Sequence, residues 1–168
     1  MLYSTGTHIV WAYRRHHWLY THGMKGLALL LAKRTRRKLG ADIFPSVQIG
    51  RRFSIDHGIG VVIGATSIIG DDCLIYQGVT LGMTGKHGGK RHPTLGSNVM
   101  VGAGAIVLGD ITIGDNAKVA AGSVVVHDVP HDVTVAGVPA KVVRDRRFNG
   151  PRLVEDDFDP SKLDDENV

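Results

Sequence analysis

A six-residue period runs through the stretch VIGATSIIGDDCLIYQGVTLG, which covers residues 62–82. Ile63, Ile69, Ile75 and Leu81 stand six positions apart, and a glycine directly follows three of them. Neither the 3.6-residue period of an α-helix nor the two-residue period of a flat strand fits this spacing. A period of six is typical of a parallel β-helix, in which the chain forms a short strand, turns and repeats.

The same period extends in both directions along the chain. Upstream it includes Ile49 and Ile55, followed by a two-residue slip before Ile63. Downstream, after an interruption, it resumes at Leu95, Val101, Val107, Ile113, Val119 and Val125. We expect these aliphatic side chains to point inward and stack on one another, with three hexads closing each triangular coil. The sequence therefore predicts a mainly β fold over residues 42–143.

The two flanks of the repeat have different compositions. Residues 1–41 contain eight Lys or Arg and no acidic residue, and they predict a helical segment over residues 7–39 that ends at Gly40. Gly23 and Gly26 are expected to divide this segment into two helices. An apolar face is expected to pack in the core or against another subunit; its members are Trp11, Trp18, Leu19, Leu27, Leu30 and Leu31. Residues 144–168 are acidic and poor in apolar residues, so they predict a flexible tail.

The composition restricts the class of protein. A chain of 168 residues, 43% hydrophobic and 21% charged, fits one folded domain rather than global disorder. The longest apolar run has seven residues, whereas a membrane span needs about 20, and the polar N-terminus does not resemble a secretory signal. The single cysteine, Cys73, fits a reducing compartment, and we expect a cytoplasmic protein. No nucleic-acid motif accompanies the basic run 33–38, so we expect neither a nucleic-acid nor a membrane partner.

Candidate chemistry lies where the repeat is interrupted. The first interruption is the insertion MTGKHGGKRHPT, residues 83–94, which carries Arg91 and His92. The second is the two-residue slip beside Asp56 and His57, and Asp42 is a further carboxylate near that end of the repeat. A histidine beside a carboxylate is the usual pairing of a general base with the group that orients it.

A zinc site is the competing use of the histidines. Within the coils the candidates are His57, His87 and His92. Of these three, only His87 and His92 are five positions apart, and both belong to the insertion. We therefore expect no metal.

Several of these segments together resemble the serine acetyltransferase family of hexapeptide-repeat acyltransferases. The resemblance covers about residues 13–143. It is carried by the segments DIFP (42–45), IDHG (55–58), GKHGGKRHP (85–93), VGAGA (101–105) and AGVPA (136–140). It implies a left-handed β-helix, a homotrimer with active sites between neighbouring subunits, and acetyl transfer from acetyl-CoA to the hydroxyl of L-serine, which begins cysteine biosynthesis.

The resemblance also implies roles for individual residues. His57 matches the general base, Asp42 its orienting carboxylate, and His92 a second active-site histidine. Asp56 is expected to hold the substrate ammonium, and Arg91 the substrate carboxylate. The matching positions for acetyl-CoA are Thr84, Ala103, Gly104, Lys118 and Ala121.

The sequence departs from the family pattern in three places. Only the last helices of the family's long N-terminal domain have counterparts in residues 1–41, so we expect a trimer rather than a hexamer. Met83 stands where the family has a glycine. The chain ends at Val168, where the family often has the isoleucine that binds O-acetylserine sulfhydrylase, so that enzyme is a candidate partner.

Three other functions compete with serine acetylation. One is acetylation of a sugar or xenobiotic hydroxyl by a related hexapeptide enzyme. Another is a non-catalytic regulator that binds the sulfhydrylase through its tail. The last is a zinc hydro-lyase.

Overall fold

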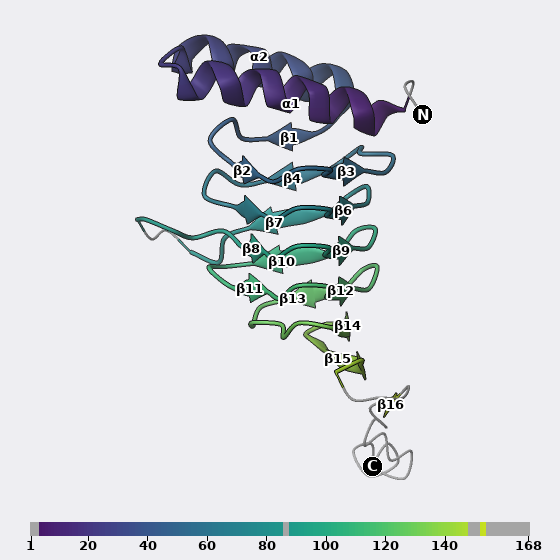
Figure 1. Ribbon diagram of the computed structural model, residues 1–168. Coiled ribbons are helices and arrows are strands. Elements are labelled where there is room, and N and C mark those ends of the chain that lie inside the picture. Colours follow the sequence, from purple (N-terminus) through teal and green to yellow (C-terminus); the bar gives the residue numbers. More distant parts are fainter. Residues whose placement is uncertain (1–3, 86–87, 148–151, 154–168) are drawn as a thin grey trace, which may run out of the picture.

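Two antiparallel helices lie across one end of a stack of β coils (Figure 1). The computed structural model describes residues 4–85, 88–147 and 152–153. Helix α1 spans Thr5–Thr21 and α2 spans Lys25–Leu39. The connection between them contains Gly23 at φ 85°, and Gly40 ends α2 in the left-handed conformation at φ 70°. The expectation that Gly26 also interrupts the segment is wrong, because this residue lies inside α2.

The helices cover the first coil with a different face from the one predicted. Ile9 and Tyr13 of α1 are buried, and the Tyr13 hydroxyl donates to the Val47 carbonyl oxygen at 2.6 Å. Burial raises the pKa of Tyr13 to about 12. Trp11 and Leu30 are instead 75% and 62% exposed, so the predicted apolar face does not pack in the core of this chain.

The coils form a triangular prism with three sheets as its sides, and successive coils pair in parallel within each sheet as far as β14. Sheet A contains β1 (Asp42–Ile43), β4 (Val62–Ile63), β7 (Thr80–Gly82), β10 (Ile106–Leu108) and β13 (Val124–Val125). Sheet B contains β2 (Gln48–Ile49), β5 (Ile68–Ile69), β8 (Thr94–Leu95) and β11 (Thr112–Ile113). Sheet C contains β3 (Ser54–Ile55), β6 (Leu74–Ile75), β9 (Met100–Val101), β12 (Lys118–Val119), β14 (Val133–Gly137), β15 (Ala140–Asp145) and β16 (Arg152–Leu153).

The hexad residues fill the prism. All twelve aliphatic positions predicted to point inward, from Ile49 to Val125, are 9% exposed or less and belong to one core cluster. Strand pairing places them in register, with Ile63 beside Leu81 and Ile75 beside Val101. The predicted fold class, a left-handed parallel β-helix of hexapeptide repeats after an N-terminal helical segment, is confirmed.

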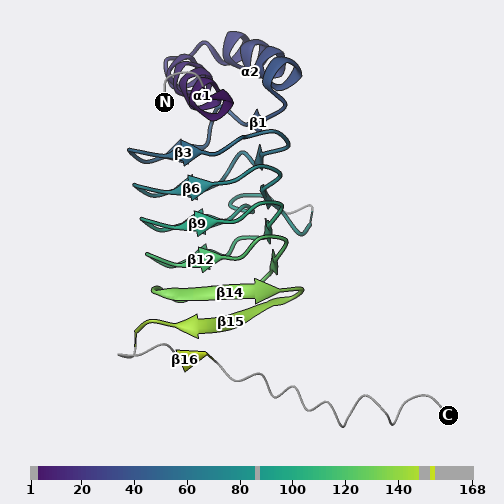
Figure 2. The same ribbon diagram turned by 90° about the vertical axis from the view of Figure 1, so that its right-hand side faces the viewer.

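The far end of the prism closes differently from the helical end. Strand β14 pairs in parallel with β12, and the chain then reverses so that β15 pairs antiparallel with β14 (Figure 2). The flexible tail was predicted from residue 144, but Arg144 and Asp145 belong to β15 and pair with β14. Residues 154–168 of that predicted tail, Val168 included, lie outside the described residues. Within the described ranges, neither helix has the length and apolarity to cross a lipid bilayer.

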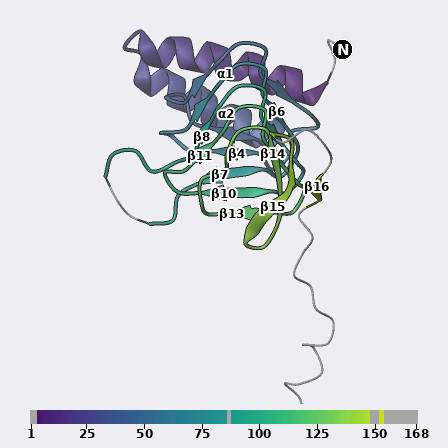
Figure 3. The same ribbon diagram turned by 60° about the horizontal axis from the view of Figure 1, so that its bottom comes forward.

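The corners of the prism position the candidate residues. Between sheets C and A, the chain turns at residues 56–61, 76–79, 102–105 and 120–123, which we call the C–A edge. Between sheets A and B, it turns at residues 44–47, 64–67, 83–93, 109–111 and 126–128, which we call the A–B edge. The predicted insertion belongs to the A–B edge and stands out from the prism (Figure 3).

Candidate active site

His57 lies at the top of the C–A edge, in the longest turn of that edge. Its backbone takes the left-handed conformation at φ 58°, and its amide donates to Asp56 Oδ1 at 3.0 Å. The ring is largely exposed, with Nε2 3.9 Å from Asp56 Oδ1. The two-residue slip in the period therefore produces a turn that presents a histidine and a carboxylate to solvent, side by side.

Asp42 lies near the same edge but contacts a different residue. Its amide donates to the Val61 carbonyl oxygen at 2.8 Å, which places it above the end of the His57 turn. Its carboxylate forms an ion pair with Arg36 Nη1 of α2 at 3.1 Å. Within this chain the structure brings His57 into contact with Asp56, and it does not join His57 to Asp42 by a hydrogen bond or ion pair. The orienting role of Asp42 stays a prediction.

His92 lies on the A–B edge, where the insertion rejoins the prism. Its side chain is packed against Gly64, where an added Cβ would lie 2.0 Å from His92 Cδ2. The residue is only 7% exposed, and its Nδ1 lies 2.8 Å from Thr66 Oγ1. Burial lowers the pKa of His92, and the positive charges of Arg91 and Lys90 lower it further. His92 is therefore neutral at neutral pH, in an environment unlike that of the exposed His57.

Two cations flank His92 on the insertion. The Lys90 ammonium donates to the His92 carbonyl oxygen and lies 3.3 Å from Asp110 Oδ1, on the next turn of the same edge. Arg91 Nε is buried and has no hydrogen-bond partner among the described residues. An unpaired guanidinium nitrogen at this depth is suited to an anionic group of a ligand, because it otherwise carries an uncompensated desolvation cost.

Most of the residues predicted to bind acetyl-CoA lie along one line. Ala103, Gly104 and Ala121 occur in successive turns of the C–A edge below His57. A Cβ added at Gly104 or at the neighbouring Gly122 would meet nothing within 4 Å, so the backbone is open there. These small residues fit an extended chain lying against the coil.

The other two acetyl-CoA candidates lie apart from that line. Lys118 is in β12 of sheet C, the strand that leads directly into the C–A edge. Thr84 is on the A–B edge near Gly109, where an added Cβ would lie 3.6 Å from Thr84 Oγ1.

The candidate residues therefore form two groups on opposite sides of sheet A. Asp42, Asp56 and His57 lie toward the C–A edge, whereas Arg91 and His92 lie on the A–B edge. Among the described residues, no hydrogen bond or ion pair joins the two groups within the chain.

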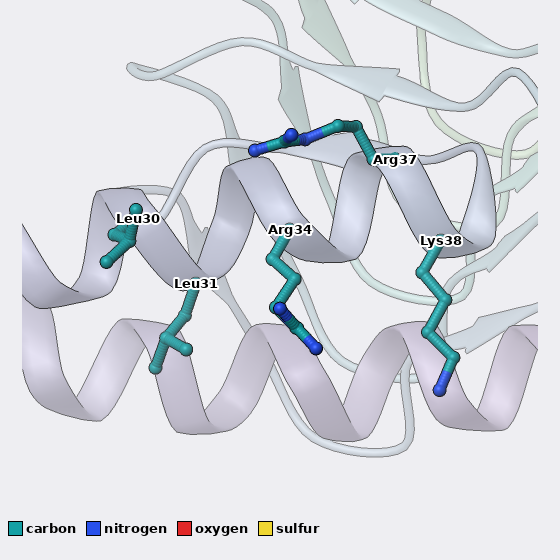
Figure 4. A pocket seen from close by; sticks show the side chains of 5 residues that line it. All are labelled: Leu30, Leu31, Arg34, Arg37 and Lys38. Atoms are coloured by element: carbon teal, nitrogen blue, oxygen red, sulfur yellow. The ribbon is translucent and has the colours of Figure 1, made fainter.

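The surface hollow on α2 lies apart from both groups of candidate residues. An open hollow of about 690 Å³ lies on α2, lined by Leu30, Leu31, Arg34, Arg37 and Lys38 (Figure 4). It belongs to the helical end rather than to either edge. Among the described residues, no group of three or more His, Cys, Asp or Glu side chains is placed to hold a metal ion. His87, one of the zinc candidates, lies outside those residues.

Thr66, Lys90 and Arg36 contact the candidate residues but were not predicted, and neither was Asp110, which pairs with Lys90. Thr66 and His92 are 26 positions apart, and Lys90 and Asp110 are 20 apart, with one member of each pair in the insertion and the other outside it. Arg36 reaches Asp42 across the junction of helix and coil. The six-residue period shows which side chains point inward, but it gives no signal for contacts between a loop and the turn above or below it.

Comparison with known proteins agrees with this architecture. The family described as "Bacterial transferase hexapeptide (six repeats)" matches residues 92–127. A serine acetyltransferase of Synechocystis sp. is 62% identical over 131 residues, which cover 78% of this chain and 53% of that relative. The chain spans about half the length of the first curated relatives that it matches.

Solved structures give the same result. The serine acetyltransferase of Brucella abortus in complex with coenzyme A has a TM-score of 0.82 at 45% identity, covering 84% of this chain and 56% of that one. The soybean serine acetyltransferase complexed with serine has a TM-score of 0.77 at 48% identity, covering 79% and 54%.

Proposed function

This chain is a hexapeptide-repeat homologue of the serine acetyltransferases, and from this we propose that it transfers acetyl from acetyl-CoA to the hydroxyl of L-serine. The products are O-acetylserine and CoA, in the first step of cysteine biosynthesis. One observation carries the proposal. The exposed Asp56–His57 pair lies toward one edge of sheet A, and Arg91, with its unpaired Nε, stands beside the buried His92 on the other edge, so that the same coils carry a candidate base and a candidate anion-binding group.

His57 is proposed to activate the substrate hydroxyl. A serine hydroxyl is a weak nucleophile near neutral pH and needs a general base. His57 accepts the hydroxyl proton while the serine oxygen attacks the thioester carbonyl carbon. The C–S bond then breaks, and the CoA sulfur leaves with the proton returned from His57. Asp42 is proposed to orient the ring, although its carboxylate is paired with Arg36 in this chain.

The remaining candidates are proposed to bind the two substrates. Asp56 holds the ammonium of serine, and Arg91 holds its carboxylate through the guanidinium fork. His92, next to Arg91, assists substrate binding or catalysis. Acetyl-CoA lies along the open C–A edge at Ala103, Gly104 and Ala121, and it is contacted by Thr84 and Lys118.

The separation of the two edges supports a site shared between chains. Three copies arranged head to tail around a threefold axis would place the C–A edge of one copy against the A–B edge of the next. A homotrimer of this kind has three complete sites, whereas a single chain has only two incomplete halves.

A second aspect of the proposal concerns cellular setting and partner. Cys73 is buried, and burial raises the pKa of its thiol, so it is an unreactive core residue of the kind expected in the cytoplasm. A separate part of the proposal concerns a protein partner. We propose that the C-terminal tail, which ends at Val168, binds O-acetylserine sulfhydrylase. Loss of Asn167 and Val168 should reduce capture of the purified sulfhydrylase, and unchanged capture would remove this part of the proposal.

The test of activity is thiol release from acetyl-CoA by the purified protein. L-serine is compared with homoserine, a galactoside and no acceptor. Release that depends on L-serine is expected. Thiol release only with the galactoside would indicate a sugar acetyltransferase instead. No thiol release with any acceptor would favour a non-catalytic regulator that binds the sulfhydrylase.

The role of His57 is tested with a matched pair of variants. His57→Ala should lose about 10²- to 10⁴-fold in turnover, as expected for a general base. His131→Ala is the control, because His131 also stands exposed beside an aspartate, with Nδ1 2.7 Å from Asp132 Oδ2, but on another edge. Near-normal turnover by a folded His57→Ala variant would contradict the assignment.

A further inference from the structure

We propose that Thr66 is a positioning residue that fixes His92 in the neutral form with its hydrogen on Nε2, so that His92 serves as a hydrogen-bond donor to substrate. This inference deepens the proposed function and rests on it for the identity of the substrate. The assignment of the hydrogen rests on geometry alone.

The Thr66 hydroxyl has only one direction in which it can donate. The backbone amides of Arg91 and His92 both donate to Thr66 Oγ1, each at 3.1 Å. A hydroxyl oxygen has two lone pairs, so both are used by these two bonds. Its single hydrogen remains, and His92 Nδ1 lies 2.8 Å away. The hydroxyl therefore donates to Nδ1.

A second donor points at the same nitrogen. The Thr66 backbone amide lies 3.3 Å from His92 Nδ1, and a backbone N–H can only donate. With two donors directed at it, Nδ1 has to present its lone pair and cannot carry a hydrogen. In a neutral imidazole the hydrogen then resides on Nε2.

The surroundings hold the ring in this state. The ring occupies the space that the absent side chain of Gly64 leaves, because a Cβ added there would overlap the ring. The ring is therefore packed directly against the backbone of the coil. The charged groups nearby are Arg91 and Lys90 on the insertion and Asp110, which pairs with Lys90 on the next turn. The two cations and the burial of the ring both disfavour a protonated imidazole.

The two histidines consequently have complementary roles. His57 is exposed beside a carboxylate and suits the acceptance of a proton. His92 is held neutral with Nε2–H as its donor, so it stabilises an oxygen of the bound substrate without giving up its hydrogen. The Thr66 hydroxyl also ties the backbone of Arg91 to the coil, so one side chain positions both members of the pair.

The first test determines which ring nitrogen of His92 carries the hydrogen. Imidazole ¹⁵N spectra of histidine-labelled protein, assigned with a His92→Asn variant, distinguish a pyridine-type nitrogen from a pyrrole-type nitrogen. We expect pyridine-type Nδ1 and pyrrole-type Nε2 for His92 at about pH 8, above the usual histidine pKa. A pyrrole-type Nδ1 in the unaltered protein would overturn the inference without any variant.

A pair of variants tests the role of the hydroxyl. Thr66→Val keeps the shape but removes the hydroxyl, and Thr66→Ser keeps the hydroxyl. Thr66→Val leaves the backbone amide of residue 66 as the one remaining donor of that residue to Nδ1, so we expect a larger fraction of the tautomer with its hydrogen on Nδ1 and a loss of about 10- to 100-fold in kcat/KM for serine, typical of a lost supporting contact. Thr66→Ser should retain the tautomer and most of the activity.

The outcomes separate the two proposals. Unchanged His92 spectra in a folded Thr66→Val protein would remove Thr66 as the positioning residue, whatever the activity. The expected spectra without serine-dependent thiol release would leave the tautomer assignment standing and contradict the proposed function instead.

Discussion

His16 of α1 is a histidine in surroundings that favour only its neutral form. It is 2% exposed, and its Nε2 has no hydrogen-bond partner among the described residues. Burial lowers its pKa, and the neighbouring charge of Arg15 lowers it further. His16 lines a small space between the two helices and the first coil, together with Thr35 and Ala41, so a charge on its ring would disfavour the packing of the helical end.

This environment predicts that stability decreases in mild acid. The unfolded chain binds a proton at His16 near pH 6.5, whereas the folded chain binds it only at lower pH. The contribution is therefore fully present above about pH 6.5 and is lost as the pH falls toward the lower folded pKa. Denaturant unfolding of His16→Leu across this range should show a smaller loss than the unaltered protein, with a residual slope from His92, whose pKa is also lowered.

The exposed His22 supplies the control for this experiment. His22→Leu removes a histidine from the end of the same helix without changing the buried junction. If the two variants flatten the pH dependence equally, the slope does not come from the buried ring.

At the scale of the elements, the coil stack depends on its inward residues. Ile75 of β6 is fully buried, whereas Ile68 of β5 is 38% exposed on the outside of the same coil. Ile75→Ala should lower the free energy of unfolding by about 2–5 kcal/mol, because the rigid stack cannot collapse around the cavity. Ile68→Ala should cost about 1 kcal/mol or less. Equal losses in urea titrations would contradict the inward assignment.

The two helices offer a comparison between two glycines. Gly26 lies inside α2, and an added Cβ would meet nothing within 4 Å, so Gly26→Ala should stabilise the protein by about 0.5–1 kcal/mol. Gly23 has equal space but stands at φ 85°, so Gly23→Ala should destabilise it by about 1–2 kcal/mol. Thermal unfolding of both variants measures this difference, and shifts of the same sign would contradict it.

The elements also show what could be predicted from the sequence. The inward positions from Ile49 to Val125 were predictable because each repeats a local rule: one aliphatic residue per turn of chain. The outward face of the helices was not, because Trp11 and Leu30 are apolar yet point away from the coils. The contact of Thr66 with His92 was not predictable either, since it depends on where the insertion returns to the edge.

At the scale of the whole molecule, the proposed homotrimer with sites shared between chains predicts complementation. His57→Ala damages the C–A edge, and His92→Ala damages the A–B edge. Each variant alone should be nearly inactive. In randomly mixed trimers, about a quarter of the interfaces should join two intact edges, which would restore about a quarter of the normal rate.

A pair of variants on one edge provides the control for complementation. His57→Ala mixed with Asp56→Ala damages the C–A edge of every chain, so no intact interface forms and no rate should return. Confirmed mixed trimers of His57→Ala and His92→Ala without recovered activity would contradict a site built from two chains.

The reversal of the chain at β15 has a consequence beyond this molecule. Parallel coils with a constant six-residue step expose, at their last coil, a ladder that an identical coil of another copy could extend, which is the geometry of a growing fibre. The last coil here is instead followed by β15, which runs antiparallel to β14 and is itself paired with β16. At the opposite end, α1 and α2 lie across the first coil (Figure 1). The helices at one end, and the antiparallel β15 of sheet C at the other, therefore oppose end-to-end pairing with the coils of another copy.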